Sequence, residues 1–179
     1  PPRSTLFPYT TLFRSLAYAA SACACSAGTG TLLQFYDEGK TVCFPLPVTD
    51  GQKSIAPYFR DSAALFCCTL GDGATNLVRA VSGRTMSEGV VLHALFAELA
   101  EAGADLVHGK LKAEVRAPGG KRYSFGFPGA PGVDYNAALL EFLAADRIGL
   151  SAAPSGELIP EYSITAIVSF DPGARYIDA

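Results

Sequence analysis

The stretch SEGVVLHALFAELAEAGADLV, residues 87–107, decides the fold class that this sequence predicts. Ser87 is a helix-capping residue, and apolar residues follow at the spacing of a helix that buries one face: Val91, Leu92, Leu95, Phe96 and Leu99. Gly103 is expected to end this helix, and Ala104–Val107 to form a short buried strand after it. Because an apolar strand at Ala63–Leu70 precedes the helix, the order predicts an α/β domain with a parallel strand pair.

Further elements are expected on both sides of this unit. Gly71-Asp72-Gly73 predicts a tight turn, after which the chain returns as an antiparallel strand at Asn76–Val81. A second helix is expected after Asp134, which can cap it, with Leu139, Leu140 and Leu143 on its apolar face. The remaining predicted strands are Leu32–Tyr36 and Val42–Val48, joined as a hairpin by Asp-Glu-Gly-Lys, then Ile148–Ala152 and Ser163–Phe170.

A half-exposed hairpin is predicted at Lys112–Phe127, within an insertion at about residues 110–133. Leu111, Ala113 and Val115 alternate with charged residues before Gly119-Gly120, and three aromatic residues alternate after it: Tyr123, Phe125 and Phe127. Such period-two alternation is typical of a strand with one face in solvent.

The N-terminal residues are treated separately from the domain. Residues 1–15, PPRSTLFPYTTLFRS, match the translation of a common sequencing-adapter oligonucleotide, so they are taken as an assembly artefact. Residues 16–31 are expected to be a truncated or flexible segment, and residues 32–179 a single domain.

Composition excludes several classes of protein. The 179 residues are 49% hydrophobic and 17% charged, which is enough apolar material for one core, and the net charge of −3 gives no general attraction to nucleic acid. No apolar run approaches the roughly 20 residues of a membrane span. Five cysteines form an odd set without a disulfide framework, so reduced thiols and a cytoplasmic location are expected, with the oligomeric state left open.

Four stretches, in order, resemble the dinitrogenase iron-molybdenum cofactor biosynthesis family. Cys43–Gly51 (CFPLPVTDG) is similar to the family's opening strand and turn, and Ile55–Gly73 (IAPYFRDSAALFCCTLGDG) to its Pro-His-Phe-Gly loop, strand and Asp-Gly turn. Gly89–Gly109 resembles its Leu-rich helix and following strand, and Asn136–Glu157 its final helix, strand and turn.

This resemblance implies a three-layer, ribonuclease-H-like mixed sheet with helices on its faces, here with the inserted hairpin. It also implies a carrier or scaffold for an iron-sulfur or iron-molybdenum type cluster, with cluster donor or acceptor proteins as partners. In the loop where the family places its histidine this chain has Tyr58, with Arg60 in place of the following glycine, and these two residues are expected to line the cofactor site.

Three cysteines are the candidate metal ligands, because thiolates are preferred by iron-sulfur clusters. Cys67 and Cys68 are adjacent, so on a strand their side chains point to opposite faces, and only one can join Cys43 in a shared site. The alternative for the pair is two small buried hydrophobic residues. Cys23 and Cys25 are a further candidate pair, on the N-terminal segment.

Two histidines complete the candidates. His108 is expected at the end of a buried strand, where ligands gather in open α/β sheets, and is assigned to the cofactor site; a hydrogen bond to backbone is the alternative. His93 is interpreted as a solvated or core histidine of the first helix.

Catalysis is not expected. The strand Val42–Val48 contains none of the carboxylates that two-metal nuclease chemistry requires, and the chain has neither Gly-x-Ser-x-Gly nor a phosphate-binding loop. The sequence therefore favours a non-catalytic cluster carrier. The alternative is a structural or protein-interaction domain that has lost the cluster and offers its hairpin to a partner strand.

Overall fold

The computed structural model describes residues 16–27, 32–45, 59, 62–116, 120–127 and 130–170. Six strands form one sheet in the order β3-β2-β1-β4-β8-β5. They are β1 (Ala17–Ala27), β2 (Leu32–Asp37), β3 (Lys40–Pro45), β4 (Ser62–Thr69), β5 (Lys121–Ser124) and β8 (Ser163–Ser169). The helices are α1 (Asp72–Ser82), α2 (Met86–Val115) and α3 (Asn136–Leu143), and β6 (Ser151–Ala152) pairs with β7 (Leu158–Ile159) in a small hairpin.

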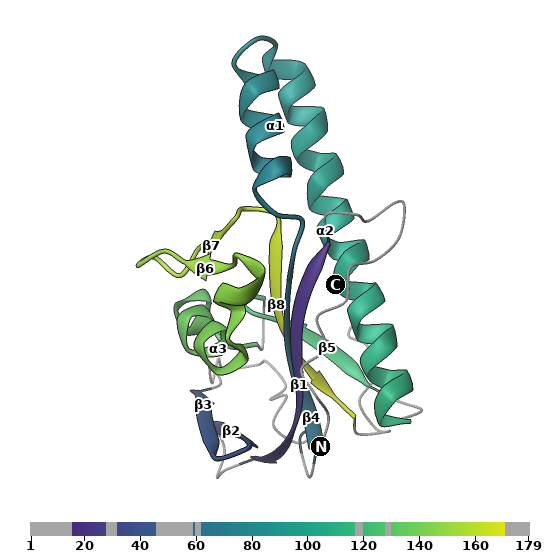
Figure 1. Cartoon of the computed structure of the whole chain (residues 1–179), viewed down its shortest axis with the longest axis vertical. Helices are drawn as coiled ribbons and strands as arrows, with labels where there is room; N and C mark the ends of the chain where they lie inside the picture. The colour runs from purple at the N-terminus through teal and green to yellow at the C-terminus, as the bar shows by residue number, and fades with distance from the viewer. Residues whose placement is uncertain are drawn as a thin grey trace, which may run out of the picture.

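The sheet has a helix on each face, which confirms the predicted α/β class and its three layers (Figure 1). Every residue of β4 from Ala63 to Thr69 is buried, because its side chains alternate between two hydrophobic clusters. Ala63, Leu65 and Cys67 pack on the side of α3, whereas Ala64, Phe66 and Cys68 pack on the side of α2. The continuous apolar run that predicted this strand is thus explained by burial on both faces.

Several predicted elements are confirmed. The hairpin β2–β3 forms around the turn at Glu38 and Gly39, and β4, β8 and α3 lie where the sequence placed them. Asp134 is not the cap of α3, since it lies in a 3₁₀ turn, Val133–Tyr135, that leads into the helix. The predicted strand Ile148–Ala152 is reduced to β6, because a second 3₁₀ turn, Ala145–Ile148, occupies its start.

The predicted mixed sheet is wrong, because every strand pairing in the described part of the chain is antiparallel. The expected parallel strand, Ala104–Val107, is helical and lies within α2, which is 30 residues long. Ala104, Val107 and Leu111 recur at helical spacing and pack against the sheet. The short apolar run was therefore the buried stripe of a long helix.

Gly103 lies inside α2 rather than at its end, and its lack of a side chain allows a neighbouring segment to pack closely against the helix. A Cβ at this position would come within 2.7 Å of Cδ1 of Leu16, the residue that precedes β1. Gly89 plays the same part near the other end of α2, where a Cβ would overlap the Ser82 side chain of α1. Glycine lowers the helix propensity at both positions, but it allows a neighbouring segment to approach the helix closely.

The predicted strand Asn76–Val81 is wrong, since these residues belong to α1. Ala74 and Val78 lie one helical turn apart and join the cluster that α2 forms with the sheet. α1 and α2 form a helical hairpin that extends beyond the end of the sheet (Figure 1). The Gly-Asp-Gly turn is thus the entry to a helix rather than to a returning strand.

The inserted hairpin at 110–133 is also wrong in its first half. Residues up to Val115 continue α2, and Arg116 ends it in the left-handed conformation. The second half is confirmed as a strand, β5, which pairs with β8 at the edge of the sheet. The strand prediction rested on the alternation of Leu111, Ala113 and Val115 with polar residues. Leu111 also lies one helical turn after Val107, and both are buried in the same cluster, so the segment is helical.

The strand β1 lies inside the sheet, between β2 and β4. It falls within the residues 16–31 that the sequence suggested to be truncated or flexible, and outside the expected domain of 32–179. Tyr18, Ala19 and Cys23 are buried there by the helices and strands that follow. Residues 1–15 lie outside the described residues.

None of the described helices is both long enough and apolar enough to cross a membrane.

Candidate functional site

The predicted thiolate ligands do not converge. Cys67 and Cys68 lie on β4 and point into different hydrophobic clusters, on opposite sides of the sheet. Burial raises the pKa of the Cys67 thiol to about 12, and that of Cys68 is raised further by burial and by its neighbour Cys67. Both thiols are therefore protonated and packed as small hydrophobic groups, which was the alternative interpretation of this pair.

Cys43 is exposed on β3, at the opposite edge of the sheet from β5. Two strands, β2 and β1, separate it from β4, so the expectation that Cys43 neighbours Cys67 or Cys68 is wrong. At about 4.8 Å per strand the separation is roughly 14 Å, beyond the reach of a shared ligand set. Within the described residues, no group of three or more His, Cys, Asp or Glu side chains is placed to hold a metal.

His108 lies in the middle of the second half of α2 rather than at a strand end, so its predicted position is wrong. It is 5% exposed, and burial lowers its pKa to about 4, with further lowering by Lys112 and Arg122. The imidazole is thus neutral at physiological pH. His93 is half exposed, with Nδ1 2.9 Å from the Tyr162 hydroxyl and 3.4 Å from Glu161, in agreement with its interpretation as a solvated histidine.

Tyr58 and Arg60, the predicted cofactor loop, lie outside the described residues. Phe59 between them is described and fully buried, with its ring 5.5 Å from that of Tyr123 and 6.1 Å from that of Phe35.

A cavity of about 730 Å³ lies at the end of the sheet where α1 begins, named here the sheet-end cavity. Its walls come from the first two turns of α1, from the turn after β5, from the start of α3 and from the β6–β7 hairpin with the segment that leads into β8. Figure 1 shows this hairpin beside the lower end of α1. Segments far apart in the sequence are therefore brought to one site by the antiparallel sheet.

A buried hydrogen-bond network shapes one wall of the cavity. Asn136, at the start of α3, donates from Nδ2 to the Gly156 carbonyl at 2.7 Å and accepts at Oδ1 from the Thr165 hydroxyl at 2.6 Å. Gly156 has φ +87°, and a side chain there would collide with the Val133 carbonyl. The network thus ties α3, β8 and the β6–β7 hairpin together at fixed spacing.

A second set of hydroxyls lies where β4 leads into α1. The Gly71 amide donates to the Thr69 hydroxyl at 3.0 Å, and the Ser163 and Thr69 hydroxyls are 2.8 Å apart. Thr75, in the same part of the cavity wall, is 6% exposed, and its Oγ1 has no hydrogen-bond partner among the described residues. An unsatisfied buried hydroxyl beside a cavity is what a bound water or ligand would satisfy.

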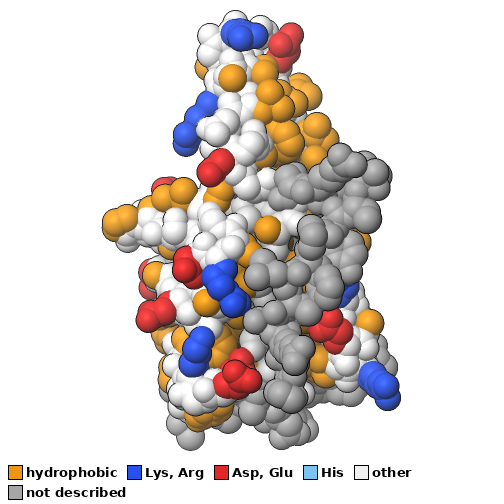
Figure 2. Space-filling model, viewed as in Figure 1, with side chains coloured by type: hydrophobic (Ala, Val, Ile, Leu, Met, Phe, Trp, Pro, Cys, Tyr) orange, Lys and Arg blue, Asp and Glu red, His pale blue; other side chains and the backbone are white. Residues whose placement is uncertain are grey.

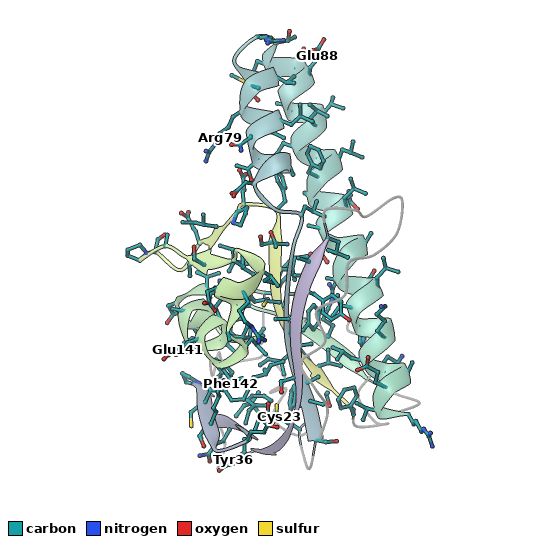
Figure 3. All side chains as sticks on the ribbon, in the orientation of Figure 1. Cys23, Tyr36, Arg79, Glu88, Glu141 and Phe142 are labelled. Atoms are coloured by element: carbon teal, nitrogen blue, oxygen red, sulfur yellow. The ribbon has the colours of Figure 1, made fainter. Side chains whose placement is uncertain are left out.

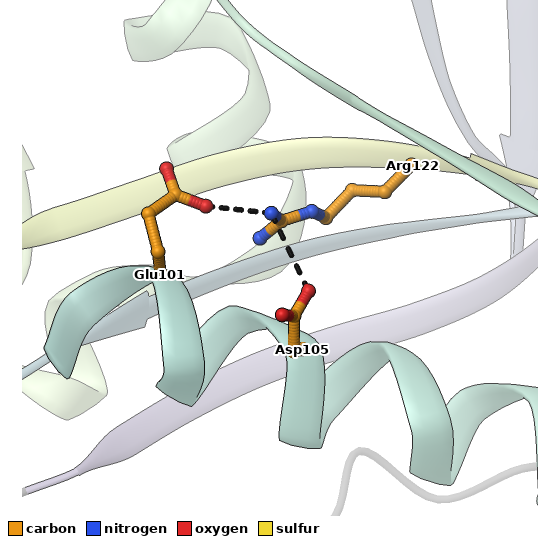
Figure 4. A network of polar contacts seen from close by, with 3 residues as sticks. All are labelled: Glu101, Asp105 and Arg122. Carbon is orange, nitrogen blue, oxygen red and sulfur yellow. Dashed lines mark hydrogen bonds and ion pairs between the residues drawn. The ribbon is translucent and has the colours of Figure 1, made fainter. Parts of the chain in front are cut away.

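The charged lining of the cavity is mixed but mainly acidic. It comprises four carboxylates, Asp72, Glu101, Glu157 and Glu161, and one guanidinium, Arg79. Figure 3 shows Arg79 projecting from α1 on the side away from α2. Glu101 is engaged by Arg122 of β5 at 2.6 Å, while Asp105 is 3.5 Å from the same guanidinium nitrogen (Figure 4).

The apolar lining includes Phe125, Phe127 and Val133, which lie between β5 and α3, and Leu158, Ile159 and Ile164 of β7 and β8. Phe127, Val133 and Ile159 are exposed although hydrophobic, which is unusual for side chains of this size gathered around one cavity. The cavity can therefore take a ligand that carries both a flat apolar group and charged groups.

None of these cavity residues was predicted from the sequence. Asn136 and Thr165 carry no recognisable motif, since their role depends on two distant segments meeting. The sequence predicts a turn at Asp72, because the segment that follows it is predicted as a strand and is in fact α1. The Pro154-Ser155-Gly156 turn was the one signal available, because glycine in a turn marks a close backbone approach.

The comparisons with known proteins concern the fold. No model of a protein family matches this sequence, and no curated protein matches it either. Among solved structures, the chain is similar to the crystal structure of the MetH reactivation domain bound to AdoHcy, with a TM-score of 0.69 and 17% sequence identity. The similarity covers 91% of this chain and 61% of that chain, so this chain spans about three fifths of that structure's length.

This similarity overturns the resemblance to the dinitrogenase iron-molybdenum cofactor biosynthesis family. The function as a carrier of an iron-sulfur or iron-molybdenum type cluster rested on that resemblance and is wrong with it. The cluster donor and acceptor partners were implied by the same resemblance and lose that support. The dispersed cysteines agree with this correction.

Cysteine reactivity tests the arrangement of the thiols. In the native protein at mildly alkaline pH, iodoacetamide is expected to alkylate Cys43 rapidly and to leave Cys67 and Cys68 unmodified until the protein unfolds, because the latter are buried and protonated. Peptide mass mapping with and without denaturant measures this difference. Alkylation of Cys67 in the native state at the rate of Cys43 would contradict the burial of β4.

The low pKa of His108 predicts a pH dependence of stability. The unfolded chain takes up a proton near pH 6.5, whereas the folded protein resists protonation of His108 down to about pH 4. The free energy of unfolding is therefore expected to be highest above pH 6.5 and to decrease as the pH falls toward 4. His108→Gln, which cannot titrate, should show a smaller decrease in urea unfolding experiments, while the carboxylates contribute equally to both proteins. Identical slopes would show that His108 is not buried as a neutral group.

Asn136 is expected to be essential to the shape of the cavity. Asn136→Ala leaves the Thr165 hydroxyl and the Gly156 carbonyl without their partner, so a loss of about 1–3 kcal/mol in the free energy of unfolding is expected. Asn76→Ala is the matched control, since Asn76 lines the same cavity but is exposed on α1. Chemical denaturation of the two variants measures the difference, and equal stability would contradict the structural role of the network.

Proposed function

We propose that this protein binds an adenosyl ligand in the sheet-end cavity. The observation that carries the proposal is the cavity itself: about 730 Å³, lined by apolar side chains, by charges of both signs and by the unsatisfied Thr75 hydroxyl. The similarity of the fold to a domain solved with AdoHcy supports the class of ligand. The proposal concerns binding, because a fold can hold different activities.

The size of the cavity suits such a ligand. Sites for small molecules are commonly about 300–1,000 Å³ and combine an apolar lining with a few polar groups. An adenine ring requires flat apolar contacts, which Phe125 and Phe127 can offer in the turn after β5. Ribose hydroxyls are donors as well as acceptors, so a carboxylate such as Glu157 or Glu161 is a suitable partner.

The charges suit the amino-acid end of a ligand like AdoHcy, which carries a carboxylate and an ammonium group. Arg79 is the one basic side chain in the described lining, and its guanidinium can bind a carboxylate with two parallel hydrogen bonds. The acidic residues around it supply partners for the ammonium group. Since Glu101 is already engaged by Arg122 and Glu161 lies 3.4 Å from His93 Nδ1, Asp72 and Glu157 are the carboxylates best placed for this role.

A non-catalytic role is part of the proposal. Among the described residues, neither a cysteine nor a histidine lines the cavity, so the side chains most often used as nucleophile and general base are not at hand there. Binding, with consequences for the conformation of the cavity walls, is the function that these groups support.

Calorimetric titration with AdoHcy tests the proposal. Binding with one ligand per chain is expected, and adenosine alone should bind more weakly because it lacks the amino-acid end. At a ligand concentration of about 100 Kd, binding should raise the free energy of unfolding by about 2.7 kcal/mol, which a thermal melt detects as an increase in Tm. Failure of both AdoHcy and adenosine to bind would refute the proposed ligand class.

Two substitutions locate the site. Phe127→Ala and Arg79→Ala are each expected to weaken AdoHcy binding about tenfold, through loss of ring stacking and of a carboxylate partner respectively. One control is Tyr36→Ala, an exposed aromatic at the far end of the molecule (Figure 3). The other is Arg84→Ala, in the turn between α1 and α2. Both controls should bind as the unsubstituted protein does. Equal losses in variants and controls would place the ligand elsewhere.

A further inference from the structure

Three of the side chains that α1 contributes to the sheet-end cavity lie in a single row along the helix, named here the α1 row. They are Asp72, Thr75 and Arg79. By the geometry of a helix, these three positions fall within a sector of about 60° and are spread over about 10 Å along the helix axis. A carboxylate, a hydroxyl and a guanidinium therefore follow one another along one wall of the cavity.

The two charged members of the α1 row are not engaged elsewhere in the described part of the chain. Neither Asp72 nor Arg79 has a hydrogen bond or an ion pair with another described residue. Figure 2 shows charged side chains along α1 on the side of the β6–β7 hairpin, whereas hydrophobic side chains gather over α2. The three other carboxylates of the lining each have a partner: Arg122 for Glu101, Ser155 for Glu157 and His93 for Glu161.

Thr75 is the buried member of the α1 row. It is 6% exposed, and its hydroxyl has no hydrogen-bond partner among the described residues. A threonine inside a helix commonly bonds its hydroxyl to a carbonyl of the preceding turn, and Thr75 does not. Helical side chains lean toward the N-terminus, so Thr75 leans toward the turn of Asp72, and Arg79 toward the turn of Thr75. An oxygen atom of a ligand at this point would satisfy the buried hydroxyl.

An α-amino acid group carries the charges that the α1 row complements. Its ammonium group needs a carboxylate, which Asp72 offers, and its carboxylate needs donors, which the Thr75 hydroxyl and the Arg79 guanidinium offer. A chain of phosphates carries negative charge only, and it would meet four carboxylates and one guanidinium in the described lining. The cavity therefore favours a zwitterionic group over the phosphates of a nucleotide.

We infer that the α1 row is the subsite for the α-amino acid group of the ligand, and that Thr75 is the residue that determines its specificity. This inference rests on the proposed function and names the class of ligand within it, which is an adenosyl compound that keeps a free α-amino acid group. The adenine ring is then left to the aromatic side chains in the turn after β5. Adenosyl compounds that end in phosphates are excluded.

Calorimetric titration with three ligands tests this inference. Methylthioadenosine has the adenosyl thioether of AdoHcy without the α-amino acid group, and ADP has phosphates in place of that group. The unsubstituted protein should bind AdoHcy at least about tenfold more tightly than either of the other two ligands. Thr75→Val, which removes the hydroxyl, and Asp72→Asn, which removes the charge, should each weaken AdoHcy binding about tenfold and change methylthioadenosine binding by less than about twofold.

Three controls separate a lost contact from a damaged fold. Thr75→Ser keeps the hydroxyl and should recover most of the AdoHcy binding that Thr75→Val loses. Thr41→Val makes the same change at an exposed position of β3 and should bind AdoHcy as the unsubstituted protein does. Without ligand, Thr75→Val should have a Tm at least equal to that of the unsubstituted protein, because the hydroxyl that it removes has no partner in the described fold.

The outcomes distinguish this inference from the proposed function. If the unsubstituted protein binds neither AdoHcy nor methylthioadenosine, both are overturned. If it binds the two equally, or binds ADP as tightly as AdoHcy, the adenosyl site stands and the α1 row is not the subsite. The same holds if Thr75→Val or Asp72→Asn leaves AdoHcy binding unchanged, or weakens the binding of both ligands to the same extent.

Discussion

The burial of β4 on both faces is the constraint on which the rest of the structure depends. A strand whose residues alternate between two apolar clusters needs cover above and below the sheet, and it needs a hydrogen-bonded neighbour on each edge. β1 and β8 supply the edges, while α2 and α3 supply the cover. Because β4 leads directly into α1 and β8 starts at the same end of the sheet, the segments that line the cavity are brought together as a result of this arrangement.

The cavity walls are held in place by a different kind of interaction from the one that holds the core together. The core is apolar, whereas the cavity walls are fixed by amide, hydroxyl and carbonyl groups at Asn136, Gly156 and Thr165, with Thr69 and Ser163 at the entry to α1. A polar frame of this kind holds loops at defined spacing without filling the space between them. It leaves Thr75 unsatisfied and several hydrophobic side chains in solvent, and both features suit a ligand site.

Sequence patterns predicted an element correctly where the apolar residues followed a single pattern, either helical spacing or strand alternation. They misled where the same residues fitted both patterns. β4, β8 and the β2–β3 hairpin could be predicted because continuous or alternating apolar runs were bounded by turn residues. The second half of α2 was mistaken for strands, since Gly103 looked like a helix end and Leu111, Ala113 and Val115 alternate. The role of Gly103 depends on Leu16, a contact made across the fold, which no local pattern contains. The cavity was missed for the same reason.

The place of β1 has a consequence for how this domain tolerates loss of its N-terminal part. β1 joins the β2–β3 hairpin to β4, so its removal would not trim the sheet at a margin but divide it. Two fresh edges, one on β2 and one on β4, would then present unpaired amide and carbonyl groups beside exposed apolar side chains. Such edges are templates for association with other chains. A shortened product of this protein is therefore expected to be prone to aggregation rather than to persist as a smaller soluble fold.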